Sequence, residues 1–138
     1  MGKTNWTRVF LGGLLAGIVL FVLGNIAWVI YLGKPWSAAT EALGHPYPSR
    51  AIVFQLVVGI LAVWLYSAIR PRYGSGPKTA LIAGVAFWIM SALYANISLI
   101  FGGLFPAGLL LIESLTSLCL YVVATLAGAW IYKEQELG

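Results

Sequence analysis

Four long apolar stretches constrain this chain more than any other feature of its sequence. They cover about residues 9–32, 51–69, 79–101 and 107–132. Each has at least 19 residues, and a helix of that length, at about 1.5 Å per residue, crosses a hydrocarbon layer of roughly 30 Å. The stretches lack the polar–apolar alternation of barrel strands, and helices satisfy their own backbone groups in lipid. The sequence therefore predicts an all-α membrane protein with four transmembrane helices.

The composition agrees with that class and removes several others. Hydrophobic residues make up 61% of the chain, charged residues make up 9%, and there is no Asp. Soluble domains carry about 25% charged residues, so a soluble enzyme, a nucleic-acid-binding domain and a disordered tail are excluded. The single Cys119 and single His45 allow no internal disulfide and no site built from several imidazoles. We expect no metal, no cofactor and no catalytic set; an axial-ligand role for His45 stays a minor alternative.

Basic residues gather on one side of the predicted spans. Six of the eight lie before the first span, between the second and third, or after the fourth: Lys3, Arg8, Arg70, Arg72, Lys78 and Lys133. Because Lys and Arg are enriched on the cytoplasmic side of membrane proteins, both termini are predicted to be cytoplasmic. The cations between the second and third spans, Arg70, Arg72 and Lys78, either only set this orientation or also contact anionic lipid head groups.

The connections and boundary aromatics are expected to follow the membrane surface. In the long outer loop, residues 36–43 are predicted to form a short surface helix with Ser37 as its N-cap and Gly44 as its stop. The second span is expected to end at Pro71. Aromatic residues near the span ends are interpreted as interfacial anchors: Trp6, Tyr66, Tyr73, Trp130 and Tyr132 on the inner side, and Trp28, Tyr31, Trp36 and Tyr47 on the outer side.

A weak internal repeat relates the two halves of the chain. Residues 14–18 (LLAGI) match residues 81–85 (LIAGV), and residues 64–66 (WLY) match residues 130–132 (WIY), both at a shift of about 66. Such a shift is typical of a tandem duplication of a two-helix hairpin. The hypothesis is one domain, 1–138, with repeats over 9–70 and 76–133.

Small residues line the predicted helices at spacings that suit close packing in lipid, where van der Waals contact drives helix association. The residues expected at helix contacts are Gly13, Gly17, Gly24, Gly84, Ser91, Ala95, Ala124 and Gly128. Their spacing fits packing within the bundle, and it also fits packing against another subunit.

One strongly polar residue lies in the outer half of each span. These residues are Asn25, Gln55, Asn96 and Glu113, about 6–11 Å below the outer boundary at 1.5 Å per residue. Thr116 and Ser117 share a helix face with Glu113. Polar residues in hydrocarbon normally turn inward, so three interpretations remain: hydrogen bonds between helices, contact with another subunit, or a ligand-binding cup around Glu113.

Three segments carry a family resemblance. They are VVGILAVWLYSAIRPRYGSGPKTALIAGVAFW, LGGLLAGIVLFVLGN and LAGAWIYKE. They resemble a family of small four-helix bacterial integral membrane proteins that has no assigned activity. The resemblance implies a four-span protein of the bacterial inner membrane and implies no catalytic residue.

Two functions follow as hypotheses. The first is a non-catalytic subunit that packs in a larger membrane complex, for example a respiratory or photosynthetic electron-transfer assembly, or in a homo-oligomer, with room to seat lipid, quinone or pigment. The alternative is a small carrier or ligand-binding membrane protein that uses the polar cup around Glu113. Expected partners are membrane lipids and other membrane subunits or further copies of the chain, and no nucleic acid.

Overall fold

The computed structural model describes residues 3–44 and 52–133, and every long element in these ranges is a helix. The elements are α1 (Trp6–Ala27), the π-helical turn η1 (Trp28–Leu32), α2 (Gly33–Ala42), α3 (Ile52–Tyr73), α4 (Pro77–Trp88), the π-helical turn η2 (Ile89–Leu93), α5 (Tyr94–Phe101) and α6 (Ala107–Ile131). Four continuous helical stretches are long and apolar enough to cross a membrane: Trp6–Ala42, Ile52–Tyr73, Pro77–Phe101 and Ala107–Ile131. The prediction of four spans is confirmed, and the chain is a multi-pass membrane protein.

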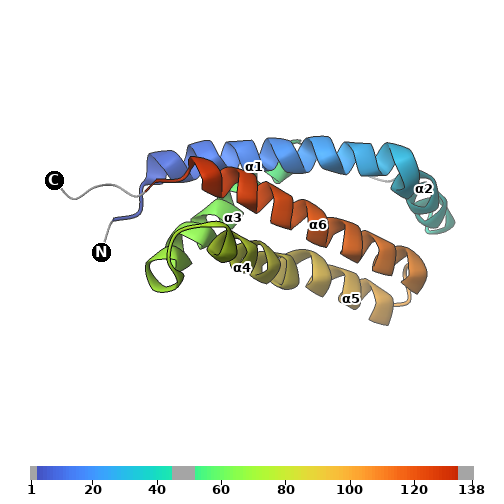
Figure 1. The fold of residues 1–138 in the computed structure, drawn as a ribbon. Coiled ribbons are helices and arrows are strands. Elements are labelled where there is room, and N and C mark those ends of the chain that lie inside the picture. The colour runs from blue at the N-terminus through green and yellow to red at the C-terminus, as the bar shows by residue number, and fades with distance from the viewer. Residues whose placement is uncertain (1–2, 45–51, 134–138) are drawn as a thin grey trace.

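The helices form an up-and-down bundle (Figure 1). α1 packs against α3 and α6, while α4 packs against α6 and, less extensively, against α3. The start of α1, the end of α6 and the turn between α3 and α4 lie at one end of the bundle, which we call the termini end. The residues between α5 and α6 lie at the opposite end, which we call the α2 end.

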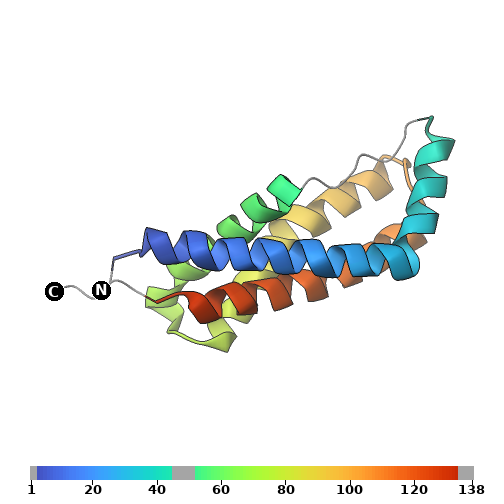
Figure 2. The same ribbon diagram turned by 90° about the horizontal axis from the view of Figure 1, so that it is seen from above.

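The first span is longer than expected. The short helix predicted over residues 36–43 of the outer loop is present as α2, but no loop precedes it, because the first helix continues through η1 into α2. Figure 2 shows α2 turning sharply away from α1 across the end of the bundle. Ser37 lies inside α2 and is not its N-cap; α2 follows η1 without a break, so its first N–H groups need no side-chain cap. Gly44 does follow the helix end with a φ of +75°, as expected of a glycine stop. His45, Tyr47 and Arg50 lie outside the described residues.

The second span also continues beyond its predicted end. Pro71 lies inside the last turn of α3, which runs to Tyr73. A proline removes one N–H donor, and near a helix end this costs a single backbone hydrogen bond. The turn into α4 is then closed by Thr79, whose Oγ1 donates to the carbonyl oxygen of Gly74 at 2.7 Å.

Glycines let α1, α3 and α6 approach so closely that a β-carbon would not fit. A Cβ at Gly17 would lie 2.6 Å from Leu56 Cα, and a Cβ at Gly12 would lie 2.5 Å from the carbonyl oxygen of Gly128. A Cβ at Gly13 would overlap Ile60, and one at Gly59 would overlap the backbone of Gly13 and Gly17. Close backbone approach of this kind supplies the van der Waals contact that holds helices together in lipid.

The other predicted contact residues divide into packed and unpacked ones. Gly84 faces α6, where a Cβ would lie 3.2 Å from Val122 Cα. Gly24 and Ala124 are buried, and Ser91 is half-buried with its hydroxyl donating to the carbonyl oxygen of Phe87. Ala95 is exposed and lies away from the packed face. Most of the small residues are therefore used inside the bundle.

Three of the expected interfacial aromatics belong to the core. Tyr66 and Tyr132 are buried at the termini end, with ring centroids 5.9 Å apart in an edge-to-face arrangement. Trp36 is buried at the α2 end, 4.8 Å from the ring of Phe105. Because each aromatic ring lies near a span end, a sequence pattern cannot distinguish an anchor in the head-group layer from a ring folded back onto the bundle.

Candidate functional site

A cavity of about 130 Å³ lies inside the bundle, toward the α2 end. All four spans contribute to its wall. The lining residues are Leu20, Gly24, Ala27, Leu32, Gln55, Ala92, Glu113, Thr116, Ser117, Leu120 and Tyr121. Four of the six polar residues singled out from the sequence therefore line one volume: Gln55, Glu113, Thr116 and Ser117.

Glu113 lies in the second turn of α6, about 9 Å along the helix from its first residue. Its Oε2 accepts a hydrogen bond from Asn96 Nδ2 of α5. Asn96 is only 6% exposed, and its Nδ2 also donates to Ser114 Oγ at 2.9 Å. The Asn96 amide therefore joins α5 to α6 while it fixes the carboxylate of Glu113 at the cavity wall.

Ser117 is held from another side by an aromatic residue. Trp88 Nε1 donates to Ser117 Oγ at 3.0 Å and to the carbonyl oxygen of Ser114 at 3.1 Å. Sequence reasoning missed Trp88 as a polar contributor. The available signal was its mid-span position, because an indole N–H inside a bilayer needs an acceptor within the protein.

Thr116 is joined to the first span by Tyr31. The two hydroxyl oxygens lie 2.6 Å apart, and Thr116 Oγ1 also lies 2.8 Å from the carbonyl oxygen of Ile112. The position of Tyr31 near a span end predicts an interfacial anchor. In the structure it belongs to the polar cluster, because η1 directs its ring toward α6.

Gln55 and Asn25 differ in their placement. Gln55 is half-buried and reaches the cavity from α3. Asn25 is exposed, and its Nδ2 donates to the carbonyl oxygen of Phe21 on its own helix at 2.7 Å. Asn25 of the first span therefore does not join the polar residues that the sequence predicted to lie together. Residues at equal depth on different helices do not have to lie on the faces that meet.

Two π-helical turns border the cavity. η1 contributes Leu32 and η2 contributes Ala92 to the lining. A π-helical turn inserts an extra residue into a helix and is frequent at functional sites. Here the two turns lie on the first and third spans, and each contributes one residue to the wall that also holds Glu113.

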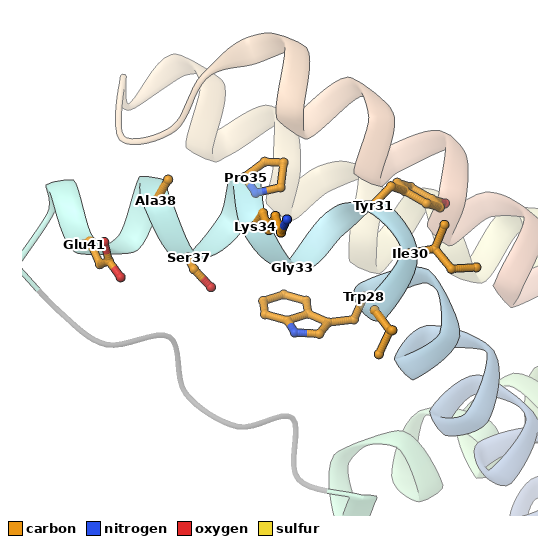
Figure 3. A pocket seen from close by; sticks show the side chains of 10 residues that line it. Trp28, Ile30, Tyr31, Gly33, Lys34, Pro35, Ser37, Ala38 and Glu41 are labelled. Carbon is orange, nitrogen blue, oxygen red and sulfur yellow. The ribbon is translucent and has the colours of Figure 1, made fainter.

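A larger hollow of about 840 Å³ lies at the bend between α1 and α2 (Figure 3). All of its lining residues come from one stretch, residues 28–41, and its two charged side chains are Lys34 and Glu41. Figure 3 shows the Trp28 ring under the start of α2, near Gly33. Because the second, third and fourth spans add nothing to its wall, this hollow is a feature of the bend and not of the bundle interior.

The predicted head-group cations separate at the termini end. Arg70 lines a third hollow of about 530 Å³, together with Lys133. Arg72 and Lys78 are exposed and do not line it. Cys119 is exposed on α6, and no three His, Cys, Asp or Glu residues come together within residues 3–44 and 52–133.

The fold and the cavity define the class: an all-helical, multi-pass membrane protein with a polar cavity between its four spans. Comparison with models of known families, with curated protein sequences and with solved structures gives no match for this chain.

Proposed function

We propose that this chain is a non-catalytic membrane protein that binds a small polar solute in the cavity around Glu113. The observation that carries the proposal is a carboxylate, fixed by Asn96, on the wall of a cavity that all four spans line. A carboxyl group inside a bilayer is costly and usually marks a binding site or a proton path.

The lining groups indicate the chemistry of the solute. Glu113 offers carboxylate oxygens, Gln55 an amide carbonyl, and Thr116 and Ser117 hydroxyl oxygens. These groups are rich in hydrogen-bond acceptors and carry one negative charge at most, which suits a small cation or a hydrogen-bond donor. Apolar walls from Leu20 and Leu120 complete the enclosure.

The volume limits the size of the solute. Pockets for drug-sized ligands occupy about 300–1,000 Å³, and this cavity has about 130 Å³. A monovalent cation, an ammonium-type ion or a few waters would fit. Quinones and pigments, which the sequence analysis considered, are too large for this cavity.

A pair of matched variants tests the proposal. Glu113→Gln and Glu41→Gln remove the same charge, but Glu41 lies on α2 and outside the cavity. Thermal unfolding of the purified chain would be followed with sodium, potassium, ammonium and methylammonium chloride. A ligand that binds the folded state and not the unfolded state raises Tm, and the shift increases with the logarithm of ligand concentration above Kd. One cation should raise the Tm of the wild type and of Glu41→Gln but not of Glu113→Gln. Equal shifts in all three proteins, or no shift in any, would contradict the proposal.

A carrier function would extend this proposal. In reconstituted vesicles, proton-coupled uptake of the cation should be abolished in Glu113→Gln, because glutamine carries no exchangeable acid proton. Binding without uptake would limit the chain to ligand binding.

A second proposed function is a non-catalytic subunit of a larger membrane complex or a homo-oligomer. The supporting observation is the apolar side chains that project outward, such as Phe101 at 88% and Trp130 at 84% exposure. Lipid covers such side chains equally well, so this proposal depends on a partner. Mass spectrometry after extraction in a mild detergent decides it: a stoichiometric partner or a second copy supports it, and a lone chain contradicts it.

We also propose the orientation and origin of the fold. Six of the seven Lys and Arg residues in the described ranges flank the termini end: Lys3, Arg8, Arg70, Arg72, Lys78 and Lys133. This excess favours a cytoplasmic location for that end in a bacterial inner membrane. A π-helical turn in the first span of each half, η1 after α1 and η2 after α4, supports a hairpin duplication. The orientation is tested with cysteines introduced singly at Thr4 and at Lys34. The accessibility of each cysteine is measured from the outer side and from the cytoplasmic side of the membrane.

A further inference from the structure

The cavity around Glu113 and the hollow at the bend between α1 and α2 are lined by different faces of the same helical turn, η1. We propose that the hollow is the entrance to the cavity and that the hydrogen bond between Tyr31 and Thr116 closes the way between them. This proposal rests on the proposed function, because it describes how a small cation reaches the cavity. Its test uses a readout that needs no bound cation, so the two proposals can fail separately.

The turn η1 is the wall that the two volumes share. Ala27 and Leu32, which are 7% and 3% exposed, line the cavity, whereas residues 28–31 between them line the hollow. The N–H of Gly33 donates to the carbonyl oxygen of Trp28, five residues earlier. A bond over five residues brings positions five apart onto one face of the turn, as it does for Ala27 and Leu32. One turn of helix therefore separates the hollow from the cavity.

A hydrogen bond crosses from one volume to the other at this wall. Tyr31 lines the hollow (Figure 3), Thr116 lines the cavity, and their hydroxyl oxygens are 2.6 Å apart. The Thr116 hydroxyl donates its one proton to the carbonyl oxygen of Ile112 at 2.8 Å, so Tyr31 is the donor to Thr116 Oγ1. When Tyr31 turns away, Thr116 keeps its bond to Ile112, and the Tyr31 hydroxyl can donate to water. Opening therefore leaves no buried group without a partner.

Packing closes the cavity in both directions along the bundle. Toward the termini end, α1 and α3 touch at Gly17, where a Cβ would lie 2.6 Å from Leu56 Cα. Toward the α2 end lies a buried apolar cluster: Ala27, Leu32, Trp36, Leu109 and Leu110. A cation that crossed this cluster would lose its water and gain no oxygen ligand, which is costly. The wall at η1 instead places two hydroxyl oxygens, those of Tyr31 and Thr116, on the way in.

The sizes of the two volumes fit this order of events. The hollow has about 840 Å³ and the cavity about 130 Å³. A hydrated cation has room in the hollow and exchanges part of its water for protein oxygens before it enters the cavity. Hard cations prefer oxygen ligands, and the hydroxyl oxygens of Tyr31 and Thr116 lie where that exchange takes place.

Cysteine labelling of the full-length chain in detergent tests the proposal. The background is Cys119→Ala, and the reporter is Ser117→Cys, a change of similar size at a cavity residue that is 6% exposed. The probe is 2-aminoethyl methanethiosulfonate, a small cation. The cysteine thiolate forms a disulfide with its aminoethylthio group and releases methanesulfinate. Mass spectrometry of the intact chain gives the rate of labelling.

Variants of η1 are then compared in this background. Tyr31→Phe removes the hydrogen bond and keeps the ring, so labelling should be about two- to threefold faster, as expected for one hydrogen bond between partly exposed groups. Tyr31→Ala also removes the ring and should label faster again. Ile30→Ala is the matched control, because Ile30 lines the hollow, is 70% exposed and leaves the Tyr31–Thr116 pair in place. It should label at the rate of the background protein.

Equal rates in Tyr31→Ala and Ile30→Ala would overturn the proposal, and an unchanged rate in Tyr31→Phe overturns it even where Tyr31→Ala does not fold. Gln55→Ala opens the wall on α3. If only Gln55→Ala labels faster, the entrance lies on the α3 side and the proposal is wrong. A second reporter, Thr125→Cys, is at a fully buried position on α6 outside the cavity and should label slowly in every variant. Faster labelling there in the Tyr31 variants would show general loosening of the bundle and would also overturn the proposal.

Binding and entry give separate outcomes. If no cation raises Tm but the Tyr31 variants label faster, the entrance is supported and the cation assignment is wrong. If the shift in Tm depends on Glu113 but the Tyr31 variants label at the control rate, cation binding is supported and the entrance is wrong.

Discussion

The two halves of this bundle are built differently. Toward the termini end, α1, α3 and α6 meet over Gly12, Gly13, Gly59 and Gly128, and the core there is fully buried at Val9, Ala16 and Val63. Toward the α2 end, the spans line a polar cavity bordered by two π-helical turns. One half has no room for a β-carbon, and the other keeps an unfilled volume.

The two halves of the bundle therefore have different physical roles. In lipid, helix association depends on close packing, since burial of apolar surface gives little advantage over lipid contact. The glycine-packed half can supply that association. The cavity half is then free to hold polar groups that form hydrogen bonds with one another and not with lipid.

The largest expected effect is in the glycine-packed half. Gly59→Ala adds a Cβ that overlaps the backbone of Gly13 and Gly17, and neither backbone can rotate away as a side chain could. We expect a loss of about 3 kcal/mol or more in the free energy of unfolding in mixed micelles, or no folded protein. Gly108→Ala, on α6 with no atom within 4 Å of the new Cβ, is the control and should be neutral or slightly stabilising. If both substitutions lowered the free energy of unfolding equally, close packing at Gly59 would not be the cause of the loss.

The next effect is in the cavity half. Asn96→Leu removes the donor to Glu113 Oε2 and to Ser114 Oγ and leaves buried acceptors without it. We expect a loss of about 1–2 kcal/mol. Glu113→Gln, whose amide oxygen can still accept from Asn96, should cost less than about 1 kcal/mol. The two free energies of unfolding in mixed micelles check this order; a reversed order would show that the charge of Glu113, and not its hydrogen bond, holds α5 to α6.

A smaller effect is expected at Ser117. Ser117→Ala removes one of the two acceptors of Trp88 Nε1, and the carbonyl oxygen of Ser114 remains at 3.1 Å. The cost should be about 0.6 kcal/mol, the typical value for a hydrogen bond between membrane helices. Ser114→Ala leaves that carbonyl in place and removes the Asn96 contact, so it separates the two networks. A loss above about 2 kcal/mol for Ser117→Ala would contradict the shared-acceptor geometry.

The smallest effect is expected at Tyr31. Tyr31→Phe removes the hydroxyl that meets Thr116 Oγ1, while Thr116 keeps its bond to the carbonyl oxygen of Ile112. Because Tyr31 is exposed, the free energy of unfolding should fall by about 0.5 kcal/mol or less. Thermal unfolding measures it, with Tyr94→Phe on the exposed surface of α5 as the control. A loss well above 1 kcal/mol would mean that the Tyr31 hydroxyl supports the fold of the bundle and not only the contact with Thr116.

Sequence reasoning located the spans and most of the cavity, but not their details. It expected Gln55, Glu113, Thr116 and Ser117 to lie near one another, and all four line the cavity. It placed Asn25 with them because the depth was right. The helical face was wrong, because equal depth on a helix does not imply the same face, and the side chain of Asn25 is exposed and bonds to its own helix.

Packing details were equally hidden. The spacing of Gly13 and Gly17 is visible in the sequence. The role of Gly12 and Gly59 in close packing depends on the helix that lies against each of them. Trp88 and Tyr31 have the residue types of membrane anchors, and only their neighbours on α6 make them members of a polar cluster.

The amino-acid sequence is sufficient to predict four helices that are long and apolar enough to cross a membrane, because the length and apolarity of a segment govern its partitioning into hydrocarbon. Which polar groups share a cavity and which cations share a hollow is visible only in the folded bundle. Those properties depend on how helices rotate and approach one another, and that is fixed by contacts between residues far apart in the chain, such as Asn96 with Glu113 and Arg70 with Tyr132.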